Sequence, residues 1–185
     1  GEDCVTYPKF GYLPSDYPPQ PIQNAYVVCL QSVYQDLLCD GVARLMDDFD
    51  IDGVYLDSTC MPTGCSNPNH GCGYNLPDGT RAATYPVFAV RDTFRRLYTV
   101  IRQRKPDGIV DAHVYDCMNA PALAFATSYW TGEQLKRGKF ITDGLPLDRF
   151  RAECMGVNWG VPAEFLHYML GSYTDAWALA LLHDV

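Results

Sequence analysis

A long amphipathic helix followed directly by a short apolar strand sets the fold class expected for this chain. From Ser32, with Gln35 three residues later as a predicted capping box, apolar side chains recur at helical spacing as far as Phe49. After a turn at residues 50–53, the run Val-Tyr-Leu at residues 54–56 has the character of a fully buried strand. A helix that leads into a buried strand is half of a βαβ crossover, so we expect a parallel sheet.

The same alternation repeats along the rest of the chain. Further helices are predicted at residues 87–101, 121–125, 146–154 and 173–179, and further strands at residues 108–113, 127–130, 155–159 and 180–184. This order is typical of an α/β fold of the (β/α)8 TIM-barrel type. A complete barrel typically needs about 250 residues, so only its later strands are expected here, as a partial barrel. An open doubly wound sheet is the alternative, but no glycine-rich phosphate loop follows any predicted strand.

Residues 1–28 differ from the rest of the chain. They are rich in proline and tyrosine and have neither helical nor strand periodicity, so we expect an extended segment that packs on the barrel. Residues 29–185 are expected to form the C-terminal part of the barrel domain. The chain begins with neither an initiator methionine nor a signal peptide, and a processed chain or a fragment is expected.

Composition limits the partners. The 22 acidic and 14 basic residues give a formal charge of -8, which opposes binding to phosphate backbones and anionic lipid surfaces. We therefore expect no nucleic acid and no membrane as partner. No stretch approaches the roughly 20 apolar residues that cross a bilayer. Neutral ligands such as carbohydrate are the easier partners.

Polar and aromatic side chains gather at the predicted carboxyl ends of the strands, which converge on one mouth in a parallel barrel. They are Asp57, Asp111, His113, Tyr129, Trp130, Glu133, Asn158, Trp159, His183 and Asp184. Carboxylates can transfer protons and stabilise an oxocarbenium ion, and flat rings can stack on sugar faces. The predicted sugar platforms are Tyr129, Trp130 and Trp159, and the other predicted substrate-binding residues are His113, Asn158, His183 and Asp184. The histidines could instead bind a metal or be structural.

Two of these carboxylates are the candidates for catalysis. Asp57 directly follows a buried strand, where a charge is costly unless it faces a cleft or is hydrogen-bonded; a structural acid that holds the next loop is the alternative. Glu133 follows two aromatic residues and Gly132, and desolvation by the rings would suit a general acid; a solvated loop glutamate is the alternative. Glu164 could be a third cleft acid or the first-turn acid of a helix.

Eight cysteines are present, and three of them crowd one loop. Cys60, Cys65 and Cys72, with His70, could in principle form a Cys3His zinc site. Because the spacing lacks a paired CxxC knuckle, a loop disulfide or free thiols are favoured, and neither a metal nor a cofactor is assigned. Asn67 and His70 could instead line the cleft. The cysteines predicted to be buried thiols are Cys29, Cys39, Cys117 and Cys154.

Four segments carry a resemblance to a known family. They are residues 50–59, 70–74 (His-Gly-Cys-Gly-Tyr), 85–91 (Tyr-Pro-Val-Phe-Ala-Val-Arg) and 128–134 (Ser-Tyr-Trp-Thr-Gly-Glu-Gln). From about Cys29 to the end, the chain resembles bacterial proteins grouped near glycoside hydrolase family 123. The resemblance implies a (β/α)8 catalytic domain, usually within a longer chain with β-rich flanking domains and often exported. An extracellular or periplasmic location is therefore expected.

Characterised members of that family are β-N-acetylgalactosaminidases with a neighbouring Asp-Glu pair. The Asp orients the acetamido group of the substrate as nucleophile, and the Glu is the acid. Glu133 matches the acid by position, but Thr131 and Gly132 precede it, so the orienting Asp is missing. Asp57 or Asp184 could supply a second carboxylate, and a separation of about 5 Å favours retention whereas about 6.5 to 9.5 Å favours inversion.

The working hypothesis is a glycosidase-like barrel that acts on oligosaccharides, with Glu133 as general acid and Asp57 as second carboxylate. A second hypothesis is a non-catalytic interaction or assembly protein built on a truncated barrel. Its open sheet edges would be covered by other domains of a longer chain or by a homo-oligomer. A third is a zinc-dependent hydrolase that uses the cysteine-rich loop.

Overall fold

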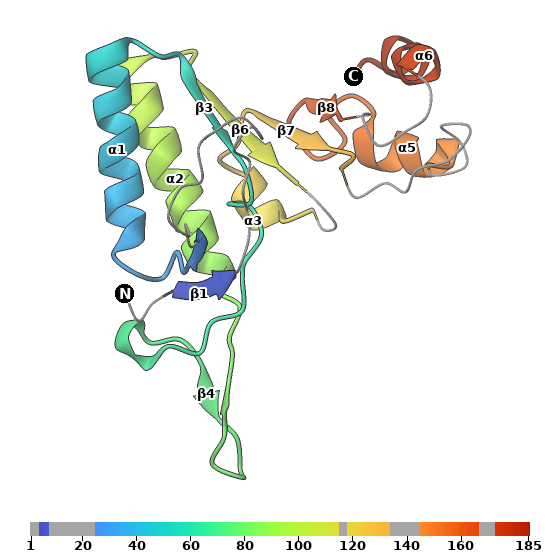
Figure 1. Cartoon of the computed structure of the whole chain (residues 1–185). Coiled ribbons are helices and arrows are strands. Elements are labelled where there is room, and N and C mark those ends of the chain that lie inside the picture. The colour runs from blue at the N-terminus through green and yellow to red at the C-terminus, as the bar shows by residue number, and fades with distance from the viewer. Residues whose placement is uncertain (1–3, 8–24, 115–117, 134–144, 167–172) are drawn as a thin grey trace, which may run out of the picture.

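A computed structural model of the chain describes residues 4–7, 25–114, 118–133, 145–166 and 173–185. Across these residues helices accompany a four-stranded parallel sheet, and two small antiparallel sheets are added (Figure 1). The parallel sheet has the order β3 (Gly53–Leu56), β6 (Ile109–His113), β7 (Ser128–Thr131) and β8 (Ala163–Phe165). The helices are α1 (Tyr34–Phe49), α2 (Val87–Arg104), α3 (Ala120–Leu123), α5 (Leu147–Cys154) and α6 (Tyr173–His183). The antiparallel pairs are β1 (Cys4–Tyr7) with β2 (Ala25–Val28) and β4 (Tyr74–Asn75) with β5 (Arg81–Ala82).

The predicted α/β class with a parallel sheet is confirmed. Periodicity placed helices α1, α2, α3 and α5 and strands β3, β6 and β7 within a few residues of their bounds. None of the described helices combines the length and the apolar character that spanning a bilayer requires. Of the predicted extended segment, residues 1–3 and 8–24 lie outside the described residues, whereas residues 4–7 and 25–28 pair as two antiparallel strands.

The strand predicted at residues 155–159 is wrong. These residues form turns between α5 and β8, and Gly156 and Gly160 take positive φ angles of 56° and 87° that a strand does not accommodate. Asn158 and Trp159 therefore precede β8 instead of ending a strand. The amide of Asn158 donates to the carbonyl of Arg151 at 2.6 Å and ties the turn to α5.

The strand predicted at residues 180–184 is also wrong. Helix α6 continues to His183, because its run of alanines and leucines favours a helix as readily as it resembles a buried strand. His183 and Asp184 thus stand at a helix end. Together with α5 and β8, α6 forms a separate small core of Leu145, Phe150, Cys154 and Ala176, with Phe165, Leu179 and Val185 packed against it.

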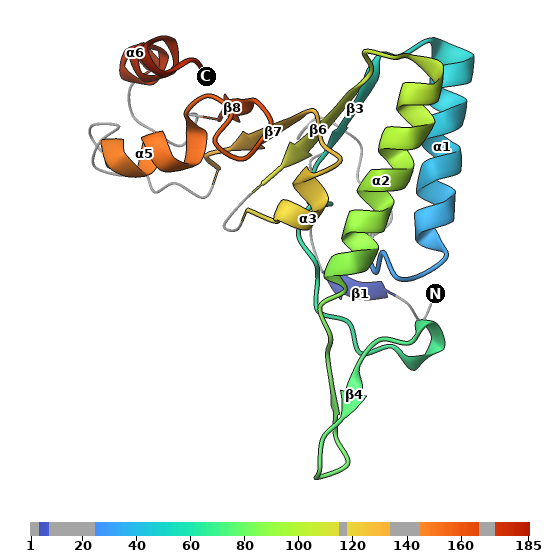
Figure 2. The same ribbon diagram turned by 180° about the vertical axis from the view of Figure 1, so that it is seen from behind.

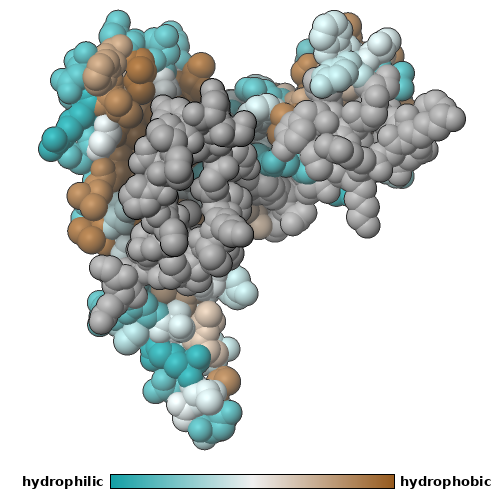
Figure 3. Space-filling model, in the orientation of Figure 1, coloured by the Kyte–Doolittle hydropathy of each residue, from teal (hydrophilic) through white to brown (hydrophobic). Residues whose placement is uncertain are grey.

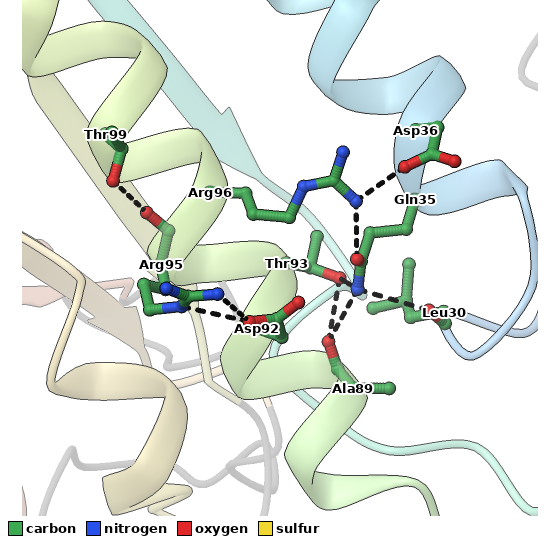
Figure 4. A network of polar contacts seen from close by, with 9 residues as sticks. All are labelled: Leu30, Gln35, Asp36, Ala89, Asp92, Thr93, Arg95, Arg96 and Thr99. Atoms are coloured by element: carbon green, nitrogen blue, oxygen red, sulfur yellow. Dashed lines mark hydrogen bonds and ion pairs between the residues drawn. The ribbon is translucent and has the colours of Figure 1, made fainter.

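Helices α1 and α2 lie side by side along the sheet and are joined by polar contacts around Gln35 (Figures 1 and 4). The Nε2 atom of Gln35 lies 3.3 Å from the carbonyl oxygen of Leu30, 3.1 Å from that of Ala89 and 2.8 Å from the hydroxyl of Thr93. Its Oε1 atom accepts a hydrogen bond from Arg96 at 2.6 Å. One amide on α1 therefore bonds three residues of α2 and the turn that precedes α1.

This arrangement corrects the predicted capping box. Gln35 does not return to the start of its own helix, because α2 offers it several partners. The hydroxyl of Ser32 instead accepts from the backbone N–H of Tyr34 at 3.3 Å, which satisfies one free donor of the first turn.

We expect Gln35→Met to lower the free energy of unfolding by roughly 1–3 kcal/mol, because hydrogen-bonding groups on α2 and in the turn before α1 lose this partner. Urea unfolding followed by circular dichroism measures the change. The exposed Gln103 on α2 gives the matched control, and Gln103→Met should shift the free energy by less than about 0.5 kcal/mol. Equal effects at the two positions would contradict the role assigned to Gln35.

The two faces of the parallel sheet carry different side chains. Successive residues of a strand point to opposite faces, and register aligns them across strands. Figures 1 and 2 show α1, α2 and α3 on one side of the sheet. The side chains packed in the core with these helices include Val54, Leu56, Val110, Ala112, Tyr129 and Ala163. The opposite face of the sheet carries polar or aromatic side chains and is named the polar face. Its residues are Tyr55, Asp111, His113, Ser128, Trp130 and Glu164.

Candidate functional site

Three ionisable side chains meet at the carboxyl ends of β3, β6 and β7. Nδ1 of His113 lies 3.0 Å from Oδ1 of Asp57, and Nε2 of the same ring lies 3.3 Å from Oε2 of Glu133. The side chain of His113 is 3% exposed, against 60% for Asp57 and 32% for Glu133. A buried imidazole therefore lies between two carboxylates that solvent can reach.

The imidazole can orient both acids. A protonated ring donates from both nitrogens, and a neutral ring donates from one and accepts at the other. The hydroxyl of Tyr55 also bonds Nδ1 of His113. Because the ring is buried and its two nitrogens face different acids, a protonated ring can set the relative placement of Asp57 and Glu133.

Aromatic rings stand beside this group. The ring centroid of Trp130 lies 5.2 Å from that of Tyr55 in an edge-on arrangement, and 6.0 Å from that of His113. Trp130 is half-buried and Tyr55 is 42% exposed. The site thus combines carboxylates with accessible aromatic surface, the combination on which a sugar can bind.

A glycine places Glu133. The φ angle of Gly132 is 126°, and a Cβ built there would lie 2.1 Å from the carbonyl oxygen of Leu166. The backbone N–H of Leu166 donates to the carbonyl of Thr131 at 2.8 Å, so this close approach continues the pairing of β7 with β8. Only glycine fits here without a shift of the backbone, and the turn directs Glu133 toward His113.

Two further acids, Asp111 and Glu164, lie on the polar face together with the hydroxyl of Ser128. Asp111 is only 8% exposed, and the hydroxyl of Ser128 donates to its Oδ1 at 2.9 Å. Burial raises the pKa of Asp111 above its ordinary value. Desolvation of its carboxyl raises the pKa of Glu164 as well, and the neighbouring charge of Asp111 adds to the rise. Glu164 thus belongs to strand β8 and to the polar face, not to the first turn of a helix.

The raised pKa of Asp111 gives a pH-dependent prediction. The folded state holds this proton more tightly than the unfolded state, so the contribution to stability is present below the unfolded pKa of about 3.9. It is lost as the pH rises through the folded pKa. Asp111→Asn keeps an oxygen acceptor for Ser128 and removes the buried charge, so it should stabilise the protein at pH 7 and bring little gain in acid.

Urea unfolding of both proteins at neutral and acidic pH tests this. The exposed Asp107 serves as control, and Asp107→Asn should change stability by less than about 0.5 kcal/mol at either pH. An Asp111→Asn protein that is less stable than the parent by the same amount at both pH values would contradict the burial of a charge at this position.

A pocket adjoins the site. It has a volume of about 250 Å³, and Asp57, which also contacts His113, is one of its lining residues. Its lining comes from the start of α1, the end of β2, the loop after β3 and the start of α2: Val28, Cys29, Leu30, Tyr34, Leu38, Asp57, Ser58, Thr59, Met61, Thr63, Pro86 and Val90. Asp57 therefore faces His113 on one side and a small cavity on the other.

Several residues expected at the site lie elsewhere. Tyr129 is fully buried on the helix-covered face, and its hydroxyl donates to the carbonyl of Glu153, so it cannot serve as a sugar platform. Side chains alternate between the two faces of a strand, so only every second residue of β7 reaches the polar face. Trp130 does so, and the prediction that its neighbour Tyr129 does too is wrong. His183 accepts a hydrogen bond from Arg151 at 3.1 Å and packs against Phe150, in the small core of α5 and α6.

The structure does not bring Asn158, Trp159 or Asp184 to the strand ends either. Asn158 and Trp159 occupy the turn before β8, and Asp184 follows α6. Sequence reasoning in turn missed Tyr55 and Ser128 as members of the polar face. Register would have identified them, because Tyr55 pairs with Asp111 and Asp111 pairs with Ser128.

Three cysteines and a histidine form a separate cluster of possible metal ligands, away from Asp57 and Glu133. One ligand atom from each of Cys29, Cys65, His70 and Cys72 falls within 4.8 Å of the others. Cys60, which the sequence grouped with this loop, is instead fully buried in the main core. Asn67 caps the short helix η1 (Pro68–His70) by accepting from the backbone N–H of Asn69 at 2.9 Å. Cys117 lies outside the described residues.

No protein-family model matches the chain, and no curated protein matches it.

Proposed function

We propose that this chain is a glycoside hydrolase-like domain whose polar face processes oligosaccharides. The placement of Asp57 and Glu133 on opposite nitrogens of the buried ring of His113 carries the proposal. Two carboxylates at a controlled separation are what glycosidic bond cleavage requires. Carbohydrate is accordingly the proposed partner, and an exported location belongs to the same proposal.

In this mechanism Glu133 protonates the glycosidic oxygen as that bond breaks. Asp57 removes a proton from a water molecule, whose oxygen attacks the anomeric carbon from the opposite side. An imidazole ring and two polar contacts separate the acids, an arrangement that favours the wider spacing of roughly 6.5 to 9.5 Å, with room for a water. Inversion of the anomeric centre is therefore expected. His113 acts as a positioning residue for both acids.

Trp130 supplies the proposed platform for a sugar ring. The pocket beside Asp57 measures about 250 Å³, below the range of roughly 300 to 1,000 Å³ typical of drug-sized ligands, and so suits a single sugar unit. The substrate would then extend from this pocket across Asp57 and Glu133 toward Trp130.

A partial barrel is the proposed architecture. The strands β3, β6, β7 and β8 neighbour one another in chain order and run parallel, as barrel strands do. Helices α1 to α3 cover one face of the sheet. Asp57 and Glu133 lie just beyond the carboxyl ends of β3 and β7, the ends at which barrel enzymes carry their sites.

The test is turnover. The chain is incubated with a panel of oligosaccharides and aryl glycosides of differing sugar and anomeric configuration, and the products are followed by proton NMR. Release of a sugar whose first-formed anomer is opposite to that of the substrate supports the proposal. A folded chain that hydrolyses none of the panel would count against it.

A second candidate is a non-catalytic assembly role. In the described residues β3 and β8 are edge strands, each paired on one side only. Figure 3 shows apolar surface along the side of the molecule that α1 forms in Figure 1. The exposed apolar residues on α1 and α6 include Leu37, Leu45, Phe49, Tyr173, Trp177, Leu181 and Leu182. Light scattering separates the candidates, since a stable monomer would exclude self-assembly.

A further inference from the structure

We propose that Cys29, Cys65, His70 and Cys72 form a structural zinc site that fastens the loop after β3 to the segment between β2 and α1. The proposal is independent of the hydrolase activity. The ligands also differ from those considered from the sequence alone, because Cys29 takes the place of Cys60.

The distances between the ligand atoms fit a tetrahedral zinc ion. The sulfur atoms of Cys29 and Cys72 are 3.7 Å apart, and Sγ of Cys65 lies 3.8 Å from Nε2 of His70. Zinc bonds of about 2.3 Å to sulfur and 2.0–2.1 Å to nitrogen place tetrahedral ligands about 3.8 Å apart for two sulfurs and about 3.6 Å apart for sulfur and nitrogen. The distances of 3.7 Å and 3.8 Å agree with these expected values. The ligands that give them come from separate segments of the chain.

The backbone holds the ligands in place. The N–H and carbonyl of Cys65 both pair with Thr84 at 2.9 Å, which anchors this cysteine to the segment that leads from β5 to α2. Gly71 takes a φ of 79°, and the N–H of Cys72 then donates to the carbonyl of Asn67 at 3.0 Å. His70 and Cys72 therefore sit on one tight turn and face the same point.

The environment suits a metal centre with only protein ligands. Cys29 and Cys72 are 6% and 2% exposed, and Cys65 and His70 are half-buried. Three thiols lose their protons to solvent on binding, so zinc, three thiolates and a neutral imidazole carry a net charge of -1. The guanidinium of Arg81, which donates to the carbonyl of Cys72, places a compensating positive charge nearby.

The loop also needs such a fastening. Figure 1 shows the β4–β5 arm reaching away from the helices. Each of its strands has two residues, and Tyr74 is 54% exposed. A segment with so little apolar burial is commonly stabilised by a metal or disulfide. Four protein ligands close the coordination sphere, which is typical of structural and not of catalytic zinc, so a zinc-dependent hydrolase at this loop is disfavoured.

Metal analysis of the whole chain tests the site. Purified chain should hold about one zinc per molecule, as a closed Cys3His site does. Cys29→Ala and Cys72→Ala should each lower the zinc content at least about tenfold, whereas Cys60→Ala should retain it. Zinc lost from Cys60→Ala and kept by Cys29→Ala would overturn the ligand set.

Two measurements on the unsubstituted chain guard against variants that fail to fold. Cobalt(II) added to the chelator-treated protein should give strong visible bands and thiolate-to-cobalt charge transfer, and chelation should lower the melting temperature until zinc is restored. Absence of zinc together with absence of these cobalt bands would overturn the proposal. Purification with iron in place of zinc, or with a Cys29–Cys72 disulfide and no metal, would do so too.

Discussion

Replacing Glu133 with glutamine is expected to slow hydrolysis of an unactivated glycoside by roughly 10²- to 10⁴-fold, the range that general acid catalysis contributes. The amide has nearly the shape of the acid but no proton to give to the departing oxygen. The protein should remain folded, because Glu133 is partly exposed and stands on a turn. The rate constants kcat and kcat/KM should fall together, since the lost interaction exists only in the transition state.

Leaving-group dependence distinguishes the two acids. A dinitrophenyl glycoside needs little protonation as it departs, so Glu133→Gln should cost much less with this substrate. Asp57→Asn should slow both substrates alike, because activation of the attacking water does not depend on the leaving group. Glu153, which pairs with Arg149 on α5, is the matched control, and Glu153→Gln should leave the rates unchanged. An equal loss with both substrates for Glu133→Gln would remove its assignment as the acid.

Replacing Gly132 with alanine is expected to destabilise the fold by more than about 3 kcal/mol, in the range that diagnoses a specific steric conflict. The added Cβ would lie 2.1 Å from the carbonyl oxygen of Leu166, and the φ of 126° is one that side chains rarely adopt. Relief requires β7 and β8 to separate at this point, which would also displace Glu133. Thermal and urea unfolding measure the loss.

Gly156→Ala provides the comparison. Gly156 also has a positive φ, of 56°, but a Cβ there would meet nothing within 4 Å. The cost should be only the left-handed backbone term, roughly 1–2 kcal/mol. Similar losses at the two glycines would mean that the contact with Leu166 is not what constrains Gly132.

Long periodic patterns predicted the helices that cover the sheet. Helices α1 and α2 have sixteen and eighteen residues, long enough for a period of 3.6 to separate core positions from solvent positions. The run at residues 180–184 is too short for this distinction. Its alanines and leucines fit a buried strand as well as a helix, and the neighbouring turns of α6 decided in favour of the helix.

The site was only partly accessible from the sequence. Asp57, His113 and Glu133 follow from one rule, that parallel strands end at a common edge, and the structure does bring these three together. Which neighbours accompany them depends on register, which a single sequence leaves open. A shift of one residue exchanges the faces, and this is why Tyr129 was placed at the site in company with Trp130.

The cysteine cluster shows the same limit across a longer range. Sequence proximity favoured Cys60, only five residues from Cys65, whereas Cys29 is far away along the chain. The position of Cys29 beside the loop depends on how β2 and α1 pack, a tertiary contact that local spacing does not report.

A crystal structure of the Glu133→Gln protein with an oligosaccharide bound would test directly whether Asp57 and Glu133 act on a glycosidic bond. We expect a sugar ring against Trp130, with the glycosidic oxygen within hydrogen-bonding distance of residue 133 and a water between Asp57 and the anomeric carbon. A sugar bound away from the polar face, or a polar face filled by another part of the protein, would contradict it.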